Sequence, residues 1–452
     1  MPTPRRAPLR RLALALGALL GAPAALACRD PAPPLGAHPK DQALLEASPA
    51  LAHLSTALRP PGAPIGGLLG VDPDGPKVVD LLRGPPPAFT AAPNPQFLLQ
   101  VDRQLGEQRA AAAPGAAPLR ALSYNTGLLD RRYIGGHVAV PHRSSRREAL
   151  PKAVLHDGWD VILLQEVWEW EDVARFAAAA ESAGYRWWAG EERRHVQHGV
   201  MILVKAALVS GPEERTEGQF EVQRRIERWP GPNVRRGWLT WTFTHAPTGR
   251  RLRVASSHPQ AWPQFWRERS LQARQLGLAV ADAPDDVIVL LGADLNAAPY
   301  YPHDQFGEVK GKPVDQWWRN AITYPLIRHY GDLLDVAAMA APAGDVTAMA
   351  ALPAWAPSWT RQALGGACAG VQPGVFSATD CNSLYFDSYA GEEYPARLDY
   401  LFLRDLRGAV GVHGTGHAYV DPVDLPTGRH ELSDHYGVWA ALSIAPLAPA
   451  GG

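Results

Sequence analysis

The sequence predicts an α+β fold in which two packed, mainly antiparallel β-sheets are flanked by helices. Short apolar runs bounded by polar residues recur between residues 119 and 444, as expected for buried strands. Only three segments have the length and periodicity of substantial helices, at residues 144–156, 171–183 and 265–281. Many strands with few helices favour two sheets covered by outer helices.

The strands are expected at residues 119–125, 161–165, 200–204, 238–244, 252–257, 287–291, 398–403 and 436–444. Ser144 or Ser145 can cap the first helix. Arg146 and Arg147 then lie on its solvated face or, as the alternative, at the phosphate end of a cleft. The third helix is amphipathic, with Leu271, Leu276 and Leu278 among its apolar positions.

The first 27 residues have the order of a secretory signal. Four arginines precede the apolar run at residues 12–20, and Ala25-Leu26-Ala27 precedes Cys28. The run is too short to span a bilayer. We therefore expect a secreted or periplasmic protein cleaved after Ala27, with lipidation of Cys28 as the alternative. In such an oxidising compartment Cys368 and Cys381 can pair, which stabilises by about 3 kcal/mol.

Composition divides the rest of the chain of 452 residues into two parts. Residues 28–118 are rich in Pro and Ala and read as an extension packed on the main domain. The main domain covers residues 119–445, with an irregular insertion at about 300–394. A net charge of −1 argues against a generally basic nucleic-acid binder, although it leaves room for a local basic patch.

Polar side chains stand where several predicted strands begin or end. Asp294 and Asn296 follow the run at residues 287–291, and an extended chain would put both on one side. An acid and an amide there can hold a hydrated metal ion or a phosphate oxygen, whereas an Asx-rich turn is the alternative. Comparable positions are held by Asn125, Glu166, His258, Asp399, Asp434 and His435.

Five motifs in this order resemble the endonuclease/exonuclease/phosphatase superfamily: SYNTG, LLQEVW, GADLN, RLDYLF and LSDHYGV. The resemblance covers about residues 119–444 and implies the four-layer sandwich of deoxyribonuclease I-like proteins. Within the superfamily the chain looks most like the neutral, Mg-dependent sphingomyelinases. SSHPQAW, HGVMILVK, VRRGWLTWTF and Arg274-Gln275-Leu276 carry that similarity, together with Asn382-Ser383 before Tyr394-Pro395.

The resemblance implies a role for each polar residue. Glu166 would bind the main Mg²⁺ or Mn²⁺ ion, with Asn125 at the same site; oxygen ligands suit such hard cations. His435 would be the general base, and Asp399 would fix its tautomer. Asn296 would donate to a phosphate oxygen, and Asp294 would orient the attacking water. His258 would bond the phosphoryl group or help the leaving oxygen. Asp434 would hold the loop that carries His435.

The chain also departs from bacterial sphingomyelinases. Their second, peripheral metal site is replaced here by Trp170 and Gln197-His198, so the resemblance does not carry that metal over. Their aromatic membrane hairpin corresponds to residues 404–432, where Tyr419 is the only aromatic residue. A membrane contact would have to come from the insertion, where four tryptophans lie at Trp317, Trp318, Trp355 and Trp359.

Three function classes follow. The first is an exported phosphodiesterase that hydrolyses a phospholipid at a membrane surface, most plausibly sphingomyelin to ceramide and phosphocholine. The second is an exported nuclease, for which a basic rim beside His258 and His435 is expected. The third is a non-catalytic binding protein on the same fold, disfavoured because the site residues are all present. No protein partner is implied, and a monomer is expected.

Overall fold

The computed structural model of the chain describes residues 38–41, 102, 105–107, 109, 114–130, 140–191, 198–222, 235–261, 265–297, 308–309, 312–313, 323–340, 397–419 and 423–447. The signal segment, all three cysteines and the four insertion tryptophans lie outside these residues, so the expectations that rest on them stay predictions. Among the helices within these ranges, none is both long and apolar enough to cross a membrane.

The first sheet has six strands in the order β13-β16-β1-β2-β4-β3. β1 and β2 are parallel, and the other neighbours are antiparallel. A parallel pair needs a crossover connection, which α5 (Arg143–His156) supplies. The strands are β1 (Ala117–Asn125), β2 (Val161–Gln165), β3 (Tyr185–Trp188), β4 (Val200–Lys205), β13 (Val410–Ala418) and β16 (Gly437–Ile444).

The second sheet repeats this plan in the order β11-β12-β8-β7-β6-β5. Its one parallel pair is β7 with β8, joined by α7 (Trp266–Ala281). β12 lies antiparallel beside β8, and the Cα atoms of Asp399 and Asp294 are paired in register. The strands are β5 (Val209–Gln219), β6 (Gly237–His245), β7 (Arg251–Ser257), β8 (Ile288–Asp294), β11 (Leu334–Asp335) and β12 (Asp399–Arg404).

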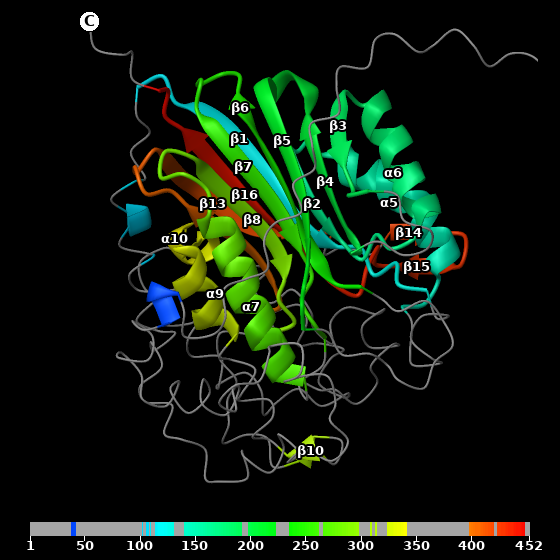
Figure 1. The fold of residues 1–452 in the computed structure, drawn as a ribbon. Coiled ribbons are helices and arrows are strands. Elements are labelled where there is room, and N and C mark those ends of the chain that lie inside the picture. The colour runs from blue at the N-terminus through cyan, green and yellow to red at the C-terminus, as the bar shows by residue number, and fades with distance from the viewer. Residues whose placement is uncertain are drawn as a thin grey trace, which may run out of the picture.

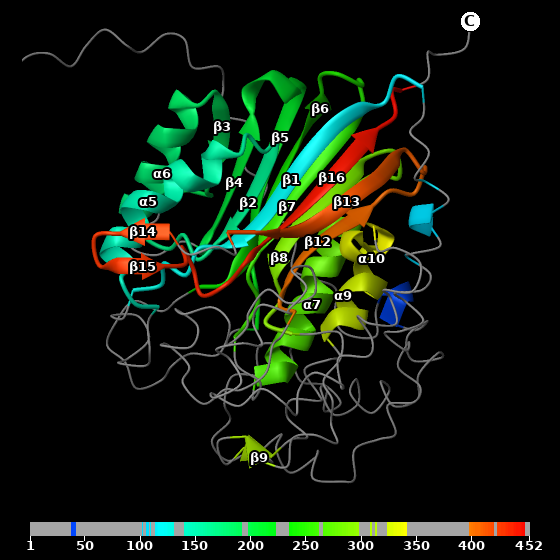
Figure 2. The ribbon, with the colours of Figure 1, turned by 180° about the vertical axis from the view of Figure 1, so that it is seen from behind.

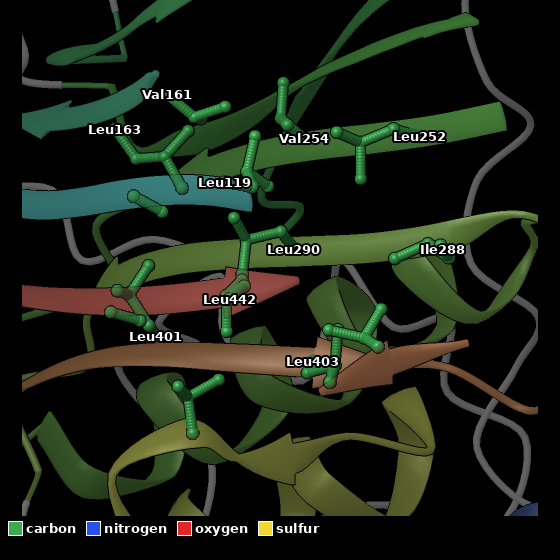
Figure 3. Close-up of a cluster of buried hydrophobic side chains, with 14 of the residues drawn as sticks. Leu119, Val161, Leu163, Leu252, Val254, Ile288, Leu290, Leu401, Leu403 and Leu442 are labelled. Atoms are coloured by element: carbon green, nitrogen blue, oxygen red, sulfur yellow. The ribbon is translucent and has the colours of Figure 1, made fainter. Parts of the chain in front are cut away.

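Three hydrophobic clusters join four layers, which Figures 1 and 2 show from opposite sides. One cluster lies between the first sheet and α5 with α6 (Trp170–Ser182). Another lies between the second sheet and α7 with α9 (Thr323–Gly331). The third fills the space between the sheets, where Figure 3 shows Leu163, Leu290 and Leu401. The predicted α+β sandwich is thereby confirmed.

The two sheets approach each other closely near the polar strand ends. A Cβ on Gly292 in β8 would lie 2.7 Å from the Leu163 Cβ of β2 and 2.9 Å from the Ser123 Oγ of β1. Beside it, Gln165 Nε2 donates to Ser123 Oγ and to Ser256 Oγ in β7, at 3.3 and 3.2 Å. This buried polar bridge fixes the ends of β1, β2 and β7 relative to one another.

Several elements differ from the sequence prediction. α5 begins at Arg143 after His142 in a left-handed conformation (φ 57°), so the predicted capping by Ser144 or Ser145 is wrong. The sequence does not predict β5, because β5 is a polar edge strand, and it does not predict β13, because β13 is rich in glycine. β3, the pair β14 (Val423–Leu425) and β15 (Gly428–His430), and the turn η4 (Ala206–Leu208) were also missed.

The insertion is partly regular, contrary to the prediction of an irregular segment. Besides α9 and β11, it contains α10 (Val336–Ala340) and the short pair β9 (Glu308–Val309) with β10 (Lys312–Pro313). α9 was missed because Pro325 stands in its first turn and because Arg328 is buried on its packed side. The N-terminal region packs nearby: a Cβ on Gly106 would lie 2.1 Å from the Met339 carbonyl oxygen of α10.

Candidate active site

The parallel pair of the first sheet delivers Asn125 and Glu166. Asn125 is the last residue of β1, and Glu166 follows β2 with a positive φ of 61° that turns its side chain out of the strand path. Asn125 Oδ1 accepts from the Gly127 amide at 2.9 Å. Glu166 Oε2 lies 3.4 Å from the Leu129 amide, and its side chain is 16% exposed.

The parallel pair of the second sheet delivers His258 and Asp294 to the same place. Asp294 Oδ2 accepts from Asn125 Nδ2 at 2.8 Å and lies 3.2 Å from His258 Nε2. His258 Nε2 is also 4.0 Å from Glu166 Oε1. These contacts cross from one sheet to the other, so the four side chains form one buried cluster.

Asn296 reaches the cluster by a turn, not by an extended strand. β8 ends at Asp294, and Asn296 has a φ of 50°. Asp294 Oδ1 accepts from the Asn296 backbone amide at 2.8 Å, which is the geometry of an Asx turn. The expectation that strand alternation aligns these two side chains is therefore wrong. Asn296 Nδ2 donates to the Pro259 carbonyl at 3.2 Å.

A histidine–carboxylate pair completes the cluster. His435 stands just before β16, and its Nδ1 lies 2.7 Å from Asp399 Oδ2 at the start of β12. Ser433 fastens the loop before it: its hydroxyl donates to the Asn125 carbonyl at 2.7 Å and accepts from the His435 amide at 3.2 Å. Asp434 Oδ1 is 3.2 Å from the same hydroxyl.

Burial and neighbouring charges separate the protonation states of these groups. Burial, reinforced by Asp434, raises the pKa of Glu166 to about 7. Burial, together with the cationic Arg236, lowers the pKa of His258 to about 4. Burial alone would raise the pKa of Asp294 and lower the pKa of His435, but neighbouring charges reverse both effects. His258 holds the pKa of Asp294 below its usual value, and Asp399 and Asp434 raise the pKa of His435 well above its usual value.

Two buried arginines hold the loops of the cluster. Arg146 donates to five backbone carbonyl oxygens at 2.7–3.3 Å: those of Thr126, Gly127, Val140 and Pro141 in the connection between β1 and α5, and that of Leu432 before β16. It is fully buried, so both sequence expectations for it, the solvated face and the phosphate contact, are wrong. Arg147 instead pairs with Asp172 and Glu171. Arg236 donates to the His258 and Pro259 carbonyls.

The residues fit a divalent cation. The raised pKa of Glu166 indicates that burial and Asp434 outweigh the positive charges of His435 and Arg236, and a bound cation would stabilise its anionic form further. The oxygen donors of Glu166 and Asn125 suit Mg²⁺ or Mn²⁺. A second grouping exists as well: one ligand atom each from Asp294, Asp399 and His435 lie within 4.8 Å of one another. The roles of the individual residues stay predictions.

The structure thus brings together all eight residues named from the sequence. Sequence reasoning did not assign a supporting role to the residues that hold them: Arg146, Arg236, Gln165, Ser256 and Ser433. Ser433 could have been noticed because it precedes the Asp434–His435 pair. A buried arginine gives no such signal, since its sequence context is that of an ordinary helix or strand end.

A family model described as the endonuclease/exonuclease/phosphatase family matches residues 122–435, a range that includes all eight residues. No curated protein matches the chain. Similar solved structures include D. rerio TDP2 complexed with single strand DNA product (18% identity, 72% of this chain and 99% of that one, TM-score 0.47).

Two further similar structures are SmcL (17% identity, 73% and 99%, TM-score 0.46) and sphingomyelinase C from Streptomyces griseocarneus (18% identity, 72% and 99%, TM-score 0.43). At these scores the likeness says nothing about what this chain binds.

Proposed function

Because the chain belongs to the endonuclease/exonuclease/phosphatase family, we propose that it is an exported, metal-dependent phosphodiesterase that hydrolyses sphingomyelin to ceramide and phosphocholine. The observation that carries the reaction type is the pair of His435 and Asp399 beside the carboxylates of Asp294 and Glu166. Phosphodiester hydrolysis needs an activated water and charge neutralisation at the phosphoryl oxygens, and this cluster offers groups for both.

Each side chain then has a task that its surroundings allow. Asp399 accepts from His435 Nδ1, which leaves Nε2 to take a proton from the attacking water. With a pKa of about 4, His258 is neutral at neutral pH, so it donates its one N–H, from Nε2, to Asp294 and does not act as a cationic acid. Asn296 has a second amide hydrogen beyond the one given to Pro259, and that hydrogen is available for a phosphate oxygen.

Glu166 and Asn125 would hold the Mg²⁺ or Mn²⁺ ion, which supplies charge stabilisation to the phosphoryl group when bound. Asp294 accepts from Asn125 and from the Asn296 backbone amide. These bonds hold its carboxylate in place, as a group that orients a water molecule requires.

The phospholipid class is supported by the segment that carries His258. The resemblance to neutral sphingomyelinases is densest there, in SSHPQAW and in the helix that follows. α7 holds this segment closely: Gln272 Oε1 accepts from the Gln260 amide at 2.6 Å, and Arg269 Nη1 donates to the Gln260 carbonyl at 2.5 Å. A membrane-surface location and a monomeric state belong to the same proposal.

The nuclease alternative requires a basic rim around the site. In the described part of the chain, the arginines that contact the site's loops are already engaged by carboxylates or carbonyl oxygens. Arg143 donates to Asp172 and to the Leu128 carbonyl, and Arg146 is fully buried. The lipid proposal is therefore preferred, and DNA cleavage is an outcome of the test.

The test is a parallel assay of purified protein with Mg²⁺ on sphingomyelin, phosphatidylcholine and duplex DNA, with His435→Ala as the control for contaminating activity. Release of phosphocholine and ceramide from sphingomyelin supports the proposal. Cleavage of DNA without lipid hydrolysis moves the protein to the nuclease class. Absence of hydrolysis of all three substrates overturns the phosphodiesterase assignment for these substrates.

A further inference from the structure

The described parts of the N-terminal region bury two aspartates against the helices that cover the second sheet. Asp41 accepts from Arg274 in α7 through both carboxylate oxygens, at 2.8 and 2.7 Å, and from the Tyr330 hydroxyl in α9 at 2.7 Å. We call Asp41, Arg274 and Tyr330 the Asp41 cluster. Its contacts fasten the N-terminal region to α7 and α9.

The second aspartate, Asp102, has a similar set of partners. Asp102 Oδ1 accepts from Arg328 Nη2 in α9 at 2.5 Å, and Oδ2 accepts from the Asp335 backbone amide at 2.9 Å. The Tyr324 hydroxyl accepts from Arg328 Nη1 at 3.3 Å and donates to Asp335 Oδ2 at 2.7 Å. We call Asp102, Arg328, Tyr324 and Asp335 the Asp102 cluster. Each cluster thus joins an aspartate of the N-terminal region to an arginine and a tyrosine.

The Asp102 cluster differs from the Asp41 cluster because it continues into β12. Asp335 Oδ1 accepts from Arg397 Nη2 at 2.6 Å, and Arg397 stands two residues before Asp399. The Arg397 carbonyl accepts from the Tyr400 hydroxyl at 2.7 Å, and that hydroxyl also reaches the Ala297 carbonyl at 2.8 Å. These bonds fix the chain where it enters β12.

We propose that Asp102 is a positioning residue for the hydrolytic reaction, acting through Asp335 and Arg397 on the Asp399 carboxylate that orients His435. The inference rests on the proposed function, because it assumes that His435 is the general base. It gives the N-terminal region a task in the site although none of the described residues of that region belongs to the cluster around His435.

The physical reason is that Arg328 and Arg397 compete for the carboxylate of Asp335. Asp102 occupies Arg328 and the Asp335 amide, so Asp335 Oδ1 can accept from Arg397 as well as from the Ala337 amide. Without Asp102, Arg328 has Asp335 as the nearest remaining carboxylate among the described members of the cluster. Arg328 already contacts Asp335 through the Tyr324 hydroxyl, so Asp335 turns toward it and releases Arg397.

Release of Arg397 matters because the His435–Asp399 contact is short and buried. A displacement of about 1 Å in a catalytic pair can cost about a hundredfold in rate. Burial raises the pKa of Asp102 to about 7, whereas Arg397 and Tyr324 hold the pKa of Asp335 below its usual value despite burial. Asp335 therefore stays ionised, and Asp102 directs it through hydrogen bonds as much as through charge.

The two clusters supply matched variants. Asp102→Asn and Tyr324→Phe should each lower kcat, by about tenfold for the first and a fewfold for the second, with KM changed less than twofold. Asp41→Asn and Tyr330→Phe remove equivalent bonds from the Asp41 cluster. They should lower the melting temperature by similar amounts but leave kcat within twofold of the wild type. Tyr324→Phe keeps the test valid if Asp102→Asn fails to fold.

A double-variant cycle tests the route. If Asp102 acts through Arg397, then adding Asp102→Asn to Arg397→Met should cause no further fall in kcat. Equal kcat values in the Asp102 and Asp41 variants, compared at equal folded fraction, would overturn the proposal. So would full additivity of the losses caused by Asp102→Asn and Arg397→Met.

A measurement without substrate separates this proposal from the proposed function. The proton on His435 Nδ1, hydrogen-bonded to Asp399, should give a downfield NMR signal, assigned by its disappearance in His435→Ala. We expect Asp102→Asn to shift or broaden this signal and Asp41→Asn to leave it unchanged. If the protein hydrolyses nothing but the signal responds in this way, the positioning route stands and the proposed function fails. An unchanged signal in Asp102→Asn overturns the route.

Discussion

Each sheet directs its parallel pair of strands to the same site, but the pKa values of the two carboxyl groups that they carry are shifted in opposite directions. β1 and β2 lead to Asn125 and Glu166, whereas β7 and β8 lead to His258 and Asp294. Burial raises the pKa of Glu166 to about 7; His258 holds the pKa of Asp294 below its usual value despite burial. The nearby positive charges thus do not offset the cost of burying the Glu166 carboxylate, whereas direct contacts stabilise the Asp294 carboxylate.

This difference separates two tasks that the same residue types perform. Asp294 accepts from Asn125 Nδ2 and from the Asn296 amide and lies beside His258, so it holds the framework together. Glu166 has a single weak amide contact at 3.4 Å and partial access to solvent. A site that binds a divalent cation is expected to contain a carboxylate such as that of Glu166, which has few protein contacts and is open to the cation.

The largest effect is expected at Glu166. Glu166→Gln should lower hydrolysis by about 10³–10⁴-fold, since a bound metal ion stabilises charge in the transition state by several kcal/mol. Exhaustive EDTA treatment of the wild type should have the same effect, and added Mg²⁺ should reverse it. Activity that survives EDTA contradicts the metal requirement, and near-normal activity of Glu166→Gln contradicts the assignment of the ligand.

Glu166→Gln also tests the contrast between Glu166 and Asp294 through the free energy of unfolding. A carboxyl whose pKa is raised by folding destabilises the protein above the pKa of its unfolded state, so the wild type without metal bears this cost at pH 8. Glu166→Gln should therefore stabilise metal-free protein at pH 8 by about 1–3 kcal/mol. Asp294→Asn should destabilise it, because the pKa of Asp294 is lowered by folding. Thermal unfolding in EDTA measures the stability change of each variant. If the two variants change stability in the same direction, the contrast between Glu166 and Asp294 is refuted.

The next effect concerns His435, which the first sheet supplies. His435→Ala should lower turnover by about 10²–10⁴-fold, the contribution of a general base. Phosphocholine release from sphingomyelin is the measurement, with His413→Ala as a control because His413 lies on β13 and binds Ser443. Turnover of His435→Ala near that of the wild type would end the proposed mechanism.

A smaller effect is expected from its partner on the second sheet. Asp399→Asn keeps the imidazole but removes its orienting carboxylate, so kcat should fall about 10–100-fold with KM nearly unchanged. Because Asp399 raises the pKa of His435, the acid limb of the pH–kcat profile should move to lower pH in the variant. A limb that stays in place would show that the carboxylate does not control the imidazole.

The smallest effect tests the contact between the sheets. Gly292→Ala places a methyl group 2.7 Å from the Leu163 Cβ, so it should destabilise the fold by about 1–3 kcal/mol. Gly414→Ala is the control, because its added Cβ meets nothing closer than 3.7 Å and its φ is not positive. Urea unfolding compares the two, and equal midpoints would mean that the sheets can separate to admit the methyl group.

Sequence reasoning succeeded where burial leaves a repeated signal. The runs at Val161–Gln165 and Gly437–Ile444 are largely buried, and their apolar composition predicts them within a residue. It failed at β5, whose polar residues pair along an edge, and at Arg146, whose burial depends on carbonyl groups of the connection before α5 and of the distant Leu432. The site residues could be named through motif resemblance, but the sequence could not decide between an extended strand and the Asx turn at Asn296, because that choice depends on one backbone dihedral.

The bonds of Arg146 also bear on how this scaffold could be altered. One terminal nitrogen of its guanidinium group binds the carbonyls of both Gly127 and Val140, so two points thirteen residues apart in the chain are held by a single side chain. The other terminal nitrogen binds the carbonyls of Thr126 and Leu432. An alteration of Arg146 would therefore release, in one step, the chain beside Asn125, the entrance to α5 and the segment that leads to His435.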